Sequence, residues 1–487
     1  MLPETQITTD TTQRIKTIVR ELPADLETPI SVYLKLRDRN PSFLLESVEG
    51  GERIARYSFI GIQPRAQYIL RGNRIQVIEG TSTYSIDIEP GTDPTNFLQS
   101  EMARYHSLPQ PGLPRFIGGL VGYMSYETVR FFEPSLSSHT HLHDLPDAFY
   151  LLADIIIAFD HARRSLFLIA NILDGNDAAA NKKLDEITTL IRSPLQDVAK
   201  NAQTASVTTS NMSKEDFENK VSIAKEHIAA GDIFQVVLSQ RFDRKTSVDA
   251  FDVYRAVRRL NPSPYMFFFD FGIFENEPFY VVGASPEMFV RLENRRAALH
   301  PIAGTRHRGS DAAADSALAE ELLADPKERA EHVMLVDLGR NDLGRVCEYG
   351  SIVVSEFSTI ERYSHVMHIV SHVEGNIRPN LTAFDLVRAA FPAGTVSGAP
   401  KVRAMEIIST LESEGRGPYA GMIGYFGFDG TMDTCLAIRT MVGRGNTFSV
   451  QAGAGIVADS DPASEYLETV NKASAMLRAI DIAESNS

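Results

Sequence analysis

The sequence predicts an α+β fold that is built on large, mainly antiparallel sheets. In both halves of the chain, apolar strand-like runs follow one another without an intervening helix. Helical periodicity appears between groups of such runs, and we find no internal repeat of about 20–50 residues. Consecutive strands with interspersed helices are typical of an α+β sandwich, whereas strict alternation would indicate a doubly wound parallel sheet.

The N-terminal half is expected to begin with two short helices, over residues 11–22 and 31–39. The segments DAFYLLADIIIAFDH and RSLFLIANI are apolar over almost their whole length, which favours a buried hairpin. Further strands are expected in the apolar runs at 41–47, 57–64, 66–88 and 115–127.

Residues 193–212 have no apolar periodicity and are rich in small polar side chains. This composition is typical of a linker. We therefore expect an N-terminal lobe over residues 1–192 and a C-terminal lobe over residues 213–487.

The C-terminal lobe is expected to open with a helix that Ser213 can cap and Gly231 can end. IFQVVLSQRF follows as a strand, and helices and strands then alternate. Successive β-runs are expected in VVGASPEMFVRLE, RRAALHPIAGT, YAGMIGYFGFDG, TCLAIRTMVG and TFSVQAGAGIVA.

Charge and composition exclude several classes of partner. The chain is 43% hydrophobic and carries a formal net charge of −15 without a long basic run, so nucleic acid and anionic membranes are disfavoured. Cys347 and Cys435 are too few for a disulfide scaffold and suit a reducing cytosol. MLPETQITTDTTQ lacks the apolar region of a signal peptide, and no run is long enough to span a membrane. We expect a cytoplasmic protein.

The segment DPKERAEHVMLVDLGRND, at 325–342, predicts a helix that Asp325 caps and Pro326 begins. Helical spacing places Glu331 on one stripe with Met334, Leu335 and Leu338. A carboxylate on a core-facing stripe needs a cation, a set of donors or a raised pKa.

A second segment, SDPASEYLETVNKAS, repeats this arrangement. It carries Glu465 and Glu468 one turn apart, as Glu328 and Glu331 are in the first segment. Two helices that each offer a carboxylate pair could meet around one hard divalent cation such as Mg²⁺. Surface ion pairing or plain solvation is the alternative for either pair alone.

Two glycine-containing segments are candidates for ligand contact through the backbone. In HPIAGTRHRG a strand enters a Gly-Thr-Arg turn, which is either an ordinary turn or an anion contact. In QAGAGIV, residues 453–455 have almost no side chain, which indicates a bulge or a ligand against bare backbone. FPAGTVSGAPK lacks the Walker spacing, so nucleotide phosphate binding is rejected there.

Arg439 alternates with Cys435, Ala437 and Met441 along an expected strand, and its guanidinium is either paired structurally or bound to a carboxylate ligand. His365 and His368 lie in an apolar segment. A histidine there is more often structural than catalytic.

Taken together, these segments resemble the chorismate-utilising enzyme family over roughly residues 213–478. The N-terminal lobe, with SFLLES and FIGGLVGYMSYE, resembles that of the large subunits of the anthranilate-forming branch, over about 25–165. The ordered motifs of the C-terminal resemblance are IFQVVLSQR, NPSPYMFF, GASPEMF, PIAGTR, DPKERAEHVMLVDLGRND, VMHIVSHVEG, FPAGTVSGAPK, GPYAGMIGYFG, CLAIRT and QAGAGIVADSDPASEYLET.

The resemblance implies the β/α sandwich of this family, with two lobes. It implies a lyase that converts chorismate and ammonia to anthranilate and pyruvate, the first committed step of tryptophan biosynthesis, with Mg²⁺ as cofactor. By motif, Glu331 and Glu468 match the metal ligands, with Glu328 and Glu465 in an outer shell. Glu287 matches the general acid, and His368 and Thr395 match residues of pyruvate elimination. The positions that match substrate-binding residues are Gly304, Thr305, Tyr419, Arg439, Gly453, Ala454, Gly455 and Lys472.

Two positions distinguish branches of the family. Gln235 stands where isochorismate-forming members carry a lysine that activates water, and Ala303 stands where members that aminate C4 often carry a nucleophilic lysine. Both residues favour the anthranilate branch. The C4-aminating branch, aminodeoxychorismate synthase, and a non-catalytic tryptophan-binding member remain the alternatives.

The resemblance also implies partners. Neither Cys347 nor Cys435 has the setting of a glutaminase nucleophile, so we expect a separate glutamine amidotransferase subunit that supplies ammonia in a hetero-oligomer. Feedback inhibition by L-tryptophan is expected in a pocket shared by both lobes. The matching positions are Ser47, Pro264, Tyr265 and Met266.

Overall fold

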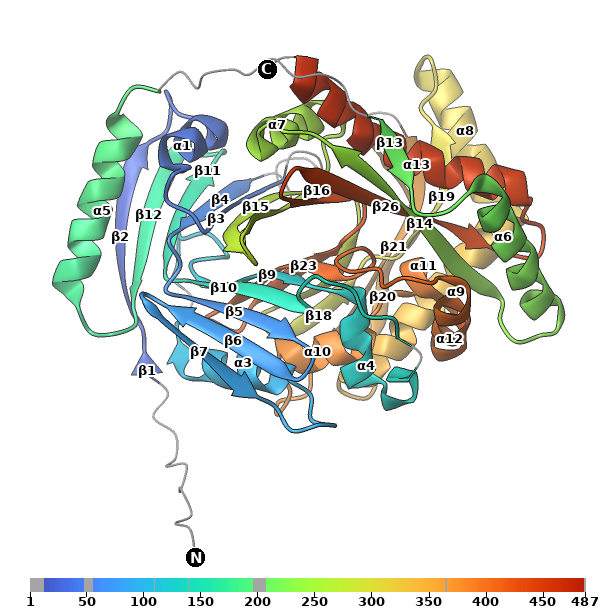
Figure 1. Cartoon of the computed structure of the whole chain (residues 1–487), viewed down its shortest axis with the longest axis horizontal. Helices are drawn as coiled ribbons and strands as arrows, with labels where there is room; N and C mark the ends of the chain where they lie inside the picture. The colour runs from blue at the N-terminus through green and yellow to red at the C-terminus, as the bar shows by residue number, and fades with distance from the viewer. Residues whose placement is uncertain are drawn as a thin grey trace, which may run out of the picture.

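A computed structural model of the chain describes residues 13–47, 56–108, 110–138, 140–195, 207–363 and 366–485. Two large sheets dominate these residues and face each other, with helices around the outside (Figure 1). The pairings within both sheets are antiparallel, and a short parallel pair joins β1 (Gln13–Arg14) to β8 (Tyr105–His106). The predicted α+β class with large antiparallel sheets is confirmed.

The first sheet has twelve strands among the described residues, with β20 (Val353–Arg362) paired to β21 beside the main path. Its order is β19 (Ile302–His307), β21 (Val366–Asn376), β18 (Arg296–Leu299), β17 (Met288–Glu293), β24 (Met432–Leu436), β23 (Met422–Gly427), β9 (Gly119–Met124), β10 (Ala148–Ala153), β5 (Ala66–Arg71), β6 (Arg74–Glu79) and β7 (Ser82–Asp87).

The second sheet also has twelve described strands, with β22 (Gly398–Ala399) paired to β14. Its order is β13 (Thr208–Ser210), β14 (Gln235–Lys245), β26 (Thr447–Ile456), β25 (Thr440–Arg444), β16 (Glu277–Ser285), β15 (Tyr265–Phe274), β3 (Ser42–Glu46), β4 (Tyr57–Ile62), β11 (Ile155–Asp160), β12 (Ser165–Ile172) and β2 (Lys16–Pro23).

Both sheets run continuously from one half of the chain into the other. In the first, β9 pairs with β23, and in the second, β3 pairs with β15. Glycine is required at the first junction, because a Cβ on Gly119 would lie 1.9 Å from the carbonyl oxygen of Phe426 on β23. The two halves therefore share their sheets. The lobe boundary stays a prediction, and residues 196–206 of the expected linker lie outside the described residues.

The space between the sheets is filled by aromatic side chains from both. Phe149 of β10 stacks on Phe271 of β15 with ring centroids 4.2 Å apart, and both rings are buried. Phe43 and Phe269 from the second sheet and Tyr123 from the first belong to the same cluster. Burial of such rings stabilises the sandwich by roughly 2–3 kcal/mol for each side chain.

Helices cover the outer faces of the sheets. Ser213 accepts a hydrogen bond from the backbone of Asp216, which confirms the expected cap of α6. Within the described part of the chain, no helix is long and apolar enough to cross a membrane. The helices are α1 (Pro29–Leu36), α3 (Thr95–Ala103), η1 (Tyr126–Thr128), α4 (Val129–Phe132), η2 (Pro134–Leu136), α5 (Asp177–Arg192), α6 (Lys214–Ala229), α7 (Ala250–Leu260), α8 (Ala312–Ala324), α9 (Pro326–Gly344), α10 (Ala383–Ala390), α11 (Gly394–Ser397), α12 (Lys401–Leu411) and α13 (Pro462–Ser485).

Two expectations for the N-terminal half need correction. Residues 13–22, the described part of the first expected helix, are not helical, because most of this segment pairs as strand β2 along β12, with Val19 opposite Ile169. Its β-branched residues suit that edge position. The long apolar run at 147–161 is also divided at Asp154: β10 joins the first sheet, and only β11 forms the expected hairpin with β12.

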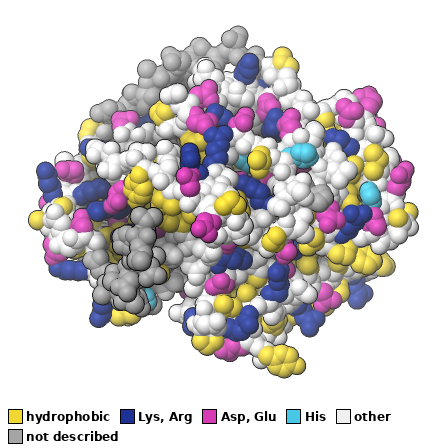
Figure 2. All heavy atoms as spheres, turned by 60° about the horizontal axis from the view of Figure 1, so that its bottom comes forward, with side chains coloured by type: hydrophobic (Ala, Val, Ile, Leu, Met, Phe, Trp, Pro, Cys, Tyr) yellow, Lys and Arg dark blue, Asp and Glu magenta, His cyan; other side chains and the backbone are white. Residues whose placement is uncertain are grey.

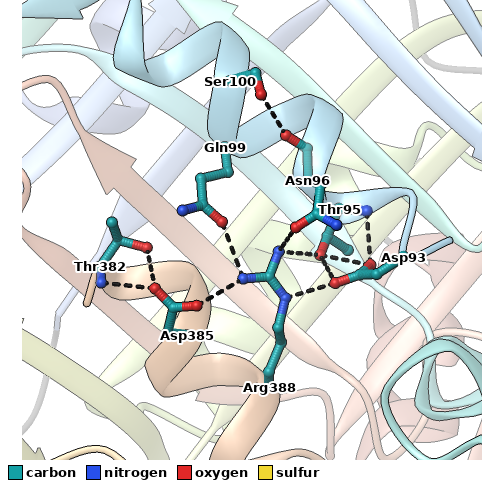
Figure 3. Close-up of polar contacts among 8 residues, drawn as sticks. All are labelled: Asp93, Thr95, Asn96, Gln99, Ser100, Thr382, Asp385 and Arg388. Carbon is teal, nitrogen blue, oxygen red and sulfur yellow. Dashed lines mark hydrogen bonds and ion pairs between the residues drawn. The ribbon is translucent and has the colours of Figure 1, made fainter. Parts of the chain in front are cut away.

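Arg388 ties α10 of the C-terminal half to α3 and the loop before it (Figure 3). Its guanidinium donates to Asp93 at 2.5 Å, to Asn96 at 2.7 Å and to Gln99 at 2.9 Å. Asp385 on its own helix accepts a further hydrogen bond at 3.0 Å. The cluster fixes α10, and the short helix α11, which carries Thr395, follows α10 closely.

Candidate active site

Glu331 lies on α9, at the edge of the buried face of that helix. Asp325 accepts hydrogen bonds from the backbone of Lys327 and Glu328, and Pro326 is the first helical residue, as expected. Of the predicted apolar stripe only Leu335 is fully buried, while Met334 and Leu338 are half-buried. The buried face is instead centred on His332, Leu335, Val336, Gly339 and Leu343, which leaves the Glu331 carboxylate half-buried at its margin.

The carboxylates of α9 and α13 lie close enough to act on one another electrostatically. Burial raises the pKa of Glu331, and the charges of Glu328 and Glu468 raise it further. Burial also raises the pKa of Glu465, with a contribution from Glu468. Among the residues that the structure describes, however, no three His, Cys, Asp or Glu side chains are gathered as a metal-binding group.

These carboxylates fit a hard divalent cation in their chemistry. Their oxygens are the donors that Mg²⁺ prefers, and their mutual repulsion is relieved by a positive charge between them. Lys472 forms an ion pair with Glu468, with its Nζ 2.7 Å from Oε1 of Glu468. The same Nζ donates a hydrogen bond to the Gly453 carbonyl oxygen at 3.0 Å. Lys472 therefore joins α13 to strand β26.

Gln235 and the glycines of β26 lie beside Glu331. Gln235 donates from Nε2 to Oε1 of Glu331 at 3.4 Å, and a Cβ on Gly455 would lie 2.7 Å from that same Nε2. A Cβ on Gly453 would lie 2.5 Å from the Tyr419 hydroxyl. Strand β26 pairs with β14 in unbroken register through residues 453–455, so the bulge that the sequence allowed is not present. The glycines instead leave room for neighbouring polar side chains.

His368 on β21 is fixed by Gly304 and Thr305, which lie in an irregular part of strand β19 and not in the turn that the sequence predicted. Its Nδ1 lies 2.8 Å from the Gly304 carbonyl oxygen and 3.1 Å from Oγ1 of Thr305. Because a carbonyl only accepts, Nδ1 carries the proton and Nε2 keeps its lone pair. Burial lowers the pKa of His368, and the charge of Arg439 lowers it as well. The ring is therefore a neutral base with Nε2 free to accept a proton.

Gly304 also lies against an outer carboxylate. It has a φ of +66°, and a Cβ there would lie 3.1 Å from Oε2 of Glu328. Sequence reasoning did not assign a role to Arg306, which donates to Glu328 at 3.2 Å and to Asp325 at 3.0 Å. Its position directly after the Gly-Thr pair was the signal that could have indicated it.

Glu287 lies between β16 and β17 and is paired with the short helix α11. Thr395 donates from Oγ1 to Oε1 of Glu287 at 2.8 Å. Burial raises the pKa of Glu287 to about 7, which keeps a large fraction of the carboxyl protonated at neutral pH. Sequence reasoning also missed the ion pair of Lys401 with Asp342, at 2.9 Å, which fixes the start of α12 after α11.

Arg439 does not alternate along a single strand, as the sequence had indicated. The chain leaves the first sheet after Leu436 and enters the second at Thr440, and Arg439 takes a φ of +50° between them. Burial lowers the pKa of its guanidinium. No ion pair holds Arg439 within the described ranges, so the structure offers no protein carboxylate for it there. A half-buried guanidinium of this kind suits a carboxylate ligand.

The residues expected to bind tryptophan line a separate pocket, between β3, β15, β23 and β24. Ser47, Pro264, Tyr265 and Met266 all contribute to its wall. The Tyr265 hydroxyl donates to Asp433 at 2.9 Å, whereas the Ser47 hydroxyl is buried without a hydrogen-bond partner. Both halves of the chain therefore meet at this pocket, as predicted.

The face of the molecule drawn in Figure 2 has acidic and basic side chains interspersed, without a continuous basic surface. Such a face does not favour phosphate-rich polymers.

The fold and the site define a chorismate-binding enzyme. A family model described as chorismate binding enzyme matches residues 40–478, and the chain belongs to this family. Anthranilate synthase component 1 of Pseudomonas putida is 46% identical over 475 residues, and the match covers 95% of each chain. The same component of Acetivibrio thermocellus is 45% identical over 476 residues, again covering 95% of each. The predicted family resemblance is confirmed.

Solved structures agree with this assignment. The anthranilate synthase component I structure from Streptococcus pneumoniae TIGR4 superposes with a TM-score of 0.77 and 35% identity, covering 93% of this chain and 98% of that one. The isochorismate synthase MenF of Escherichia coli has a TM-score of 0.71 at 20% identity and covers 97% of this chain and 96% of its own, which shows the shared fold alone.

Proposed function

We propose that this chain is the large component of an anthranilate synthase, which forms anthranilate and pyruvate from chorismate and ammonia at the start of tryptophan biosynthesis. The observation that carries the proposal is the contact of Gln235 with Glu331, at 3.4 Å. A neutral amide at this position cannot activate water for attack on the ring, so ammonia is the nucleophile that fits the site.

Glu331 and Glu468 are the groups that would hold Mg²⁺, with Glu328 and Glu465 in its outer shell. When bound, the cation supplies positive charge for the ring carboxylate of chorismate. The raised pKa values of Glu331 and Glu465 support this assignment, because carboxylates that repel one another are stabilised by a shared cation.

The remaining substrate contacts come from three elements. Arg439 and Tyr419 would bind the carboxylate of the enolpyruvyl group, and the absence of a protein carboxylate beside Arg439 in the described residues supports this role. Thr305 and Lys472 would bind ring substituents. The glycine-rich backbone of residues 453–455 would allow the ring to lie close to β26.

Amination requires a proton for the departing hydroxyl group. Ammonia forms a bond to C2, both conjugated double bonds of the ring shift, and the C4–O bond breaks as Glu287 donates its proton to the oxygen, which leaves as water. The pKa of about 7 keeps Glu287 able to donate at neutral pH, and Thr395 orients its carboxyl group. The ammonium group formed at C2 then loses a proton to solvent.

Pyruvate elimination requires a base. Nε2 of His368 removes the proton from C2, the ring becomes aromatic, and the C3–O bond to the enolpyruvyl group breaks. The enolpyruvate released takes up a proton at its methylene carbon and becomes pyruvate. The contact of His368 Nδ1 with the Gly304 carbonyl fixes the tautomer that this step needs.

Ammonia would come from a separate glutamine amidotransferase. Cys347 and Cys435 are both buried, and burial raises the pKa of each thiol, to about 11 for Cys347, so neither is an activated nucleophile. Two free thiols also suit a cytoplasmic protein. Tryptophan would inhibit from the pocket at Ser47.

The product tests the proposal. Purified chain is incubated with chorismate and ammonium, with and without Mg²⁺, and the products are identified by mass and fluorescence. We expect equal amounts of anthranilate and pyruvate, in the presence of Mg²⁺ only. A product aminated at C4 would assign the chain to aminodeoxychorismate formation. Tryptophan binding without turnover would assign it as a non-catalytic relative.

A further inference from the structure

A small cavity lies beside Glu287, and two of its polar lining residues, His300 and Asp342, have no part in the reaction scheme. Glu287, Thr395, Asp342 and His300 supply its polar wall, and the other lining residues are apolar or contribute backbone, for example Leu299 and Leu335. Its volume is about 50 Å³. A cavity of this size with several polar partners holds a few water molecules.

His300 lines this cavity and is also partly exposed to solvent. Its side chain is 21% exposed. Asp342 is held by Lys401 at 2.9 Å, with only 9% of its side chain exposed. The Nε2 atom of His300 is itself buried and makes no hydrogen bond, although Oε1 of Glu361 lies 3.3 Å from it.

Charged and titratable groups face His300 from three elements. Glu361 comes from β20, and its contact with His300 is the main cause that lowers the pKa of that carboxyl group. From β21, the His372 ring lies edge-on to the His300 ring, with the two ring centroids 5.8 Å apart. From α9, His332 lies close enough for the charge of His300 to lower its pKa, although burial of His332 is the larger cause. Asp342, also on α9, lines the cavity. Glu361 thus supplies the negative partner that an imidazolium needs.

We propose that His300 is a positioning residue that acts through Glu287, by returning a proton to this carboxyl group through cavity water after each amination. The inference rests on the proposed function, since only there is Glu287 the general acid. Each amination leaves Glu287 as a carboxylate. An N–H bond of the His300 imidazolium then breaks, protons shift along the water, and an O–H bond forms on Glu287. His300 regains its proton from solvent at its exposed side.

The test compares His300→Gln with His372→Gln. Glutamine keeps polar contacts but carries no transferable proton near neutral pH, and His372 touches the His300 ring without lining the cavity. We expect His300→Gln to lower kcat for ammonia-dependent anthranilate formation on the order of 10-fold, with KM for chorismate unchanged and a steeper loss at high pH. His372→Gln should behave as the wild type.

Rescue separates proton transfer from a structural effect. In His300→Gly, added imidazole should restore kcat with a dependence on the concentration of imidazolium. Equal kcat and pH profiles in His300→Gln and wild type would overturn the inference, as would a loss of activity in His300→Gly that imidazole does not restore. If the wild type itself forms no anthranilate, the proposed function fails and takes this inference with it.

Discussion

Thr395 donates a hydrogen bond of 2.8 Å to the carboxyl group of Glu287 and thereby joins the short helix α11 to the connection between β16 and β17. Both residues line the same cavity as His300. The pair fixes an acid with a pKa of about 7 at the point where a hydroxyl group must leave.

The raised pKa of Glu287 predicts a specific pH dependence of the reaction. At fixed concentrations of unprotonated ammonia, the rate of amination should fall as pH rises through about 7, because the carboxylate has no proton to donate. Glu287→Gln should lose amination at every pH. A wild-type rate that rises steadily across this range would contradict the assignment of Glu287 as the acid.

The same group also affects stability, and the sign follows from the direction of the shift. The pKa of Glu287 in the folded chain lies above the ordinary glutamate value. The protonated carboxyl group therefore contributes its full stabilisation of the fold at pH values below the ordinary glutamate pKa, and this contribution is lost as pH rises through about 7. When pH is raised from acid to alkaline conditions, the wild type should therefore lose roughly 3 kcal/mol of its free energy of unfolding that Glu287→Gln does not lose. Urea titrations at several pH values measure this difference.

Replacement of His368 should separate the two halves of the reaction. His368→Asn removes the base for C2 but leaves Glu287 intact, so the aminated intermediate aminodeoxyisochorismate should accumulate while anthranilate formation falls on the order of 100-fold or more. Quenched samples analysed by mass give both quantities. Equal losses of amination and of elimination would remove His368 from its proposed step.

Ser47 should control sensitivity to tryptophan. Its hydroxyl is buried without a partner in the pocket, so a ligand amine or carboxylate can bond to it. Ser47→Ala should raise the tryptophan concentration for half-inhibition about 10-fold without changing kcat. Ser85→Ala, at an exposed position of β7, is the matched control. Unchanged inhibition in Ser47→Ala would exclude this hydroxyl from the binding site.

Arg388 should stabilise the contact between α10 and α3 (Figure 3). Arg388→Ala removes a largely buried guanidinium from several acceptors and should lower the free energy of unfolding by about 2–4 kcal/mol. Arg296→Gln, which breaks an exposed pair with Glu374, should leave the urea midpoint unchanged. Similar midpoints for both variants would show that the cluster around Arg388 contributes little.

Much of the fold was predictable because its signals are local. The caps at Asp325 and Ser213 and the apolar runs of β3, β4 and β14 follow from short sequence patterns, and the structure confirms them. The failures have a common cause. Strand β2 and the breaks at Asp154 and Arg439 depend on which sheet each segment joins, and this pairing involves partners far away in the sequence.

The candidate site divides in the same way. Residue types and ordered motifs were sufficient to select Glu331, Glu468 and His368, but periodicity did not reveal that Glu331 lies at the margin of the buried face of α9. Arg306 and His300 were missed because a side chain that supports another is recognised only from contacts in three dimensions.

The Mg²⁺ dependence of anthranilate formation in Glu331→Gln and Glu468→Gln tests most directly the claim that these two glutamates serve one cation. Glu320→Gln, at an exposed position on α8, is the control. We predict that the control and the wild type depend on Mg²⁺, and that each site variant keeps its circular dichroism spectrum but loses turnover on the order of 1000-fold at every Mg²⁺ concentration. Near-normal rates in both site variants would contradict the account.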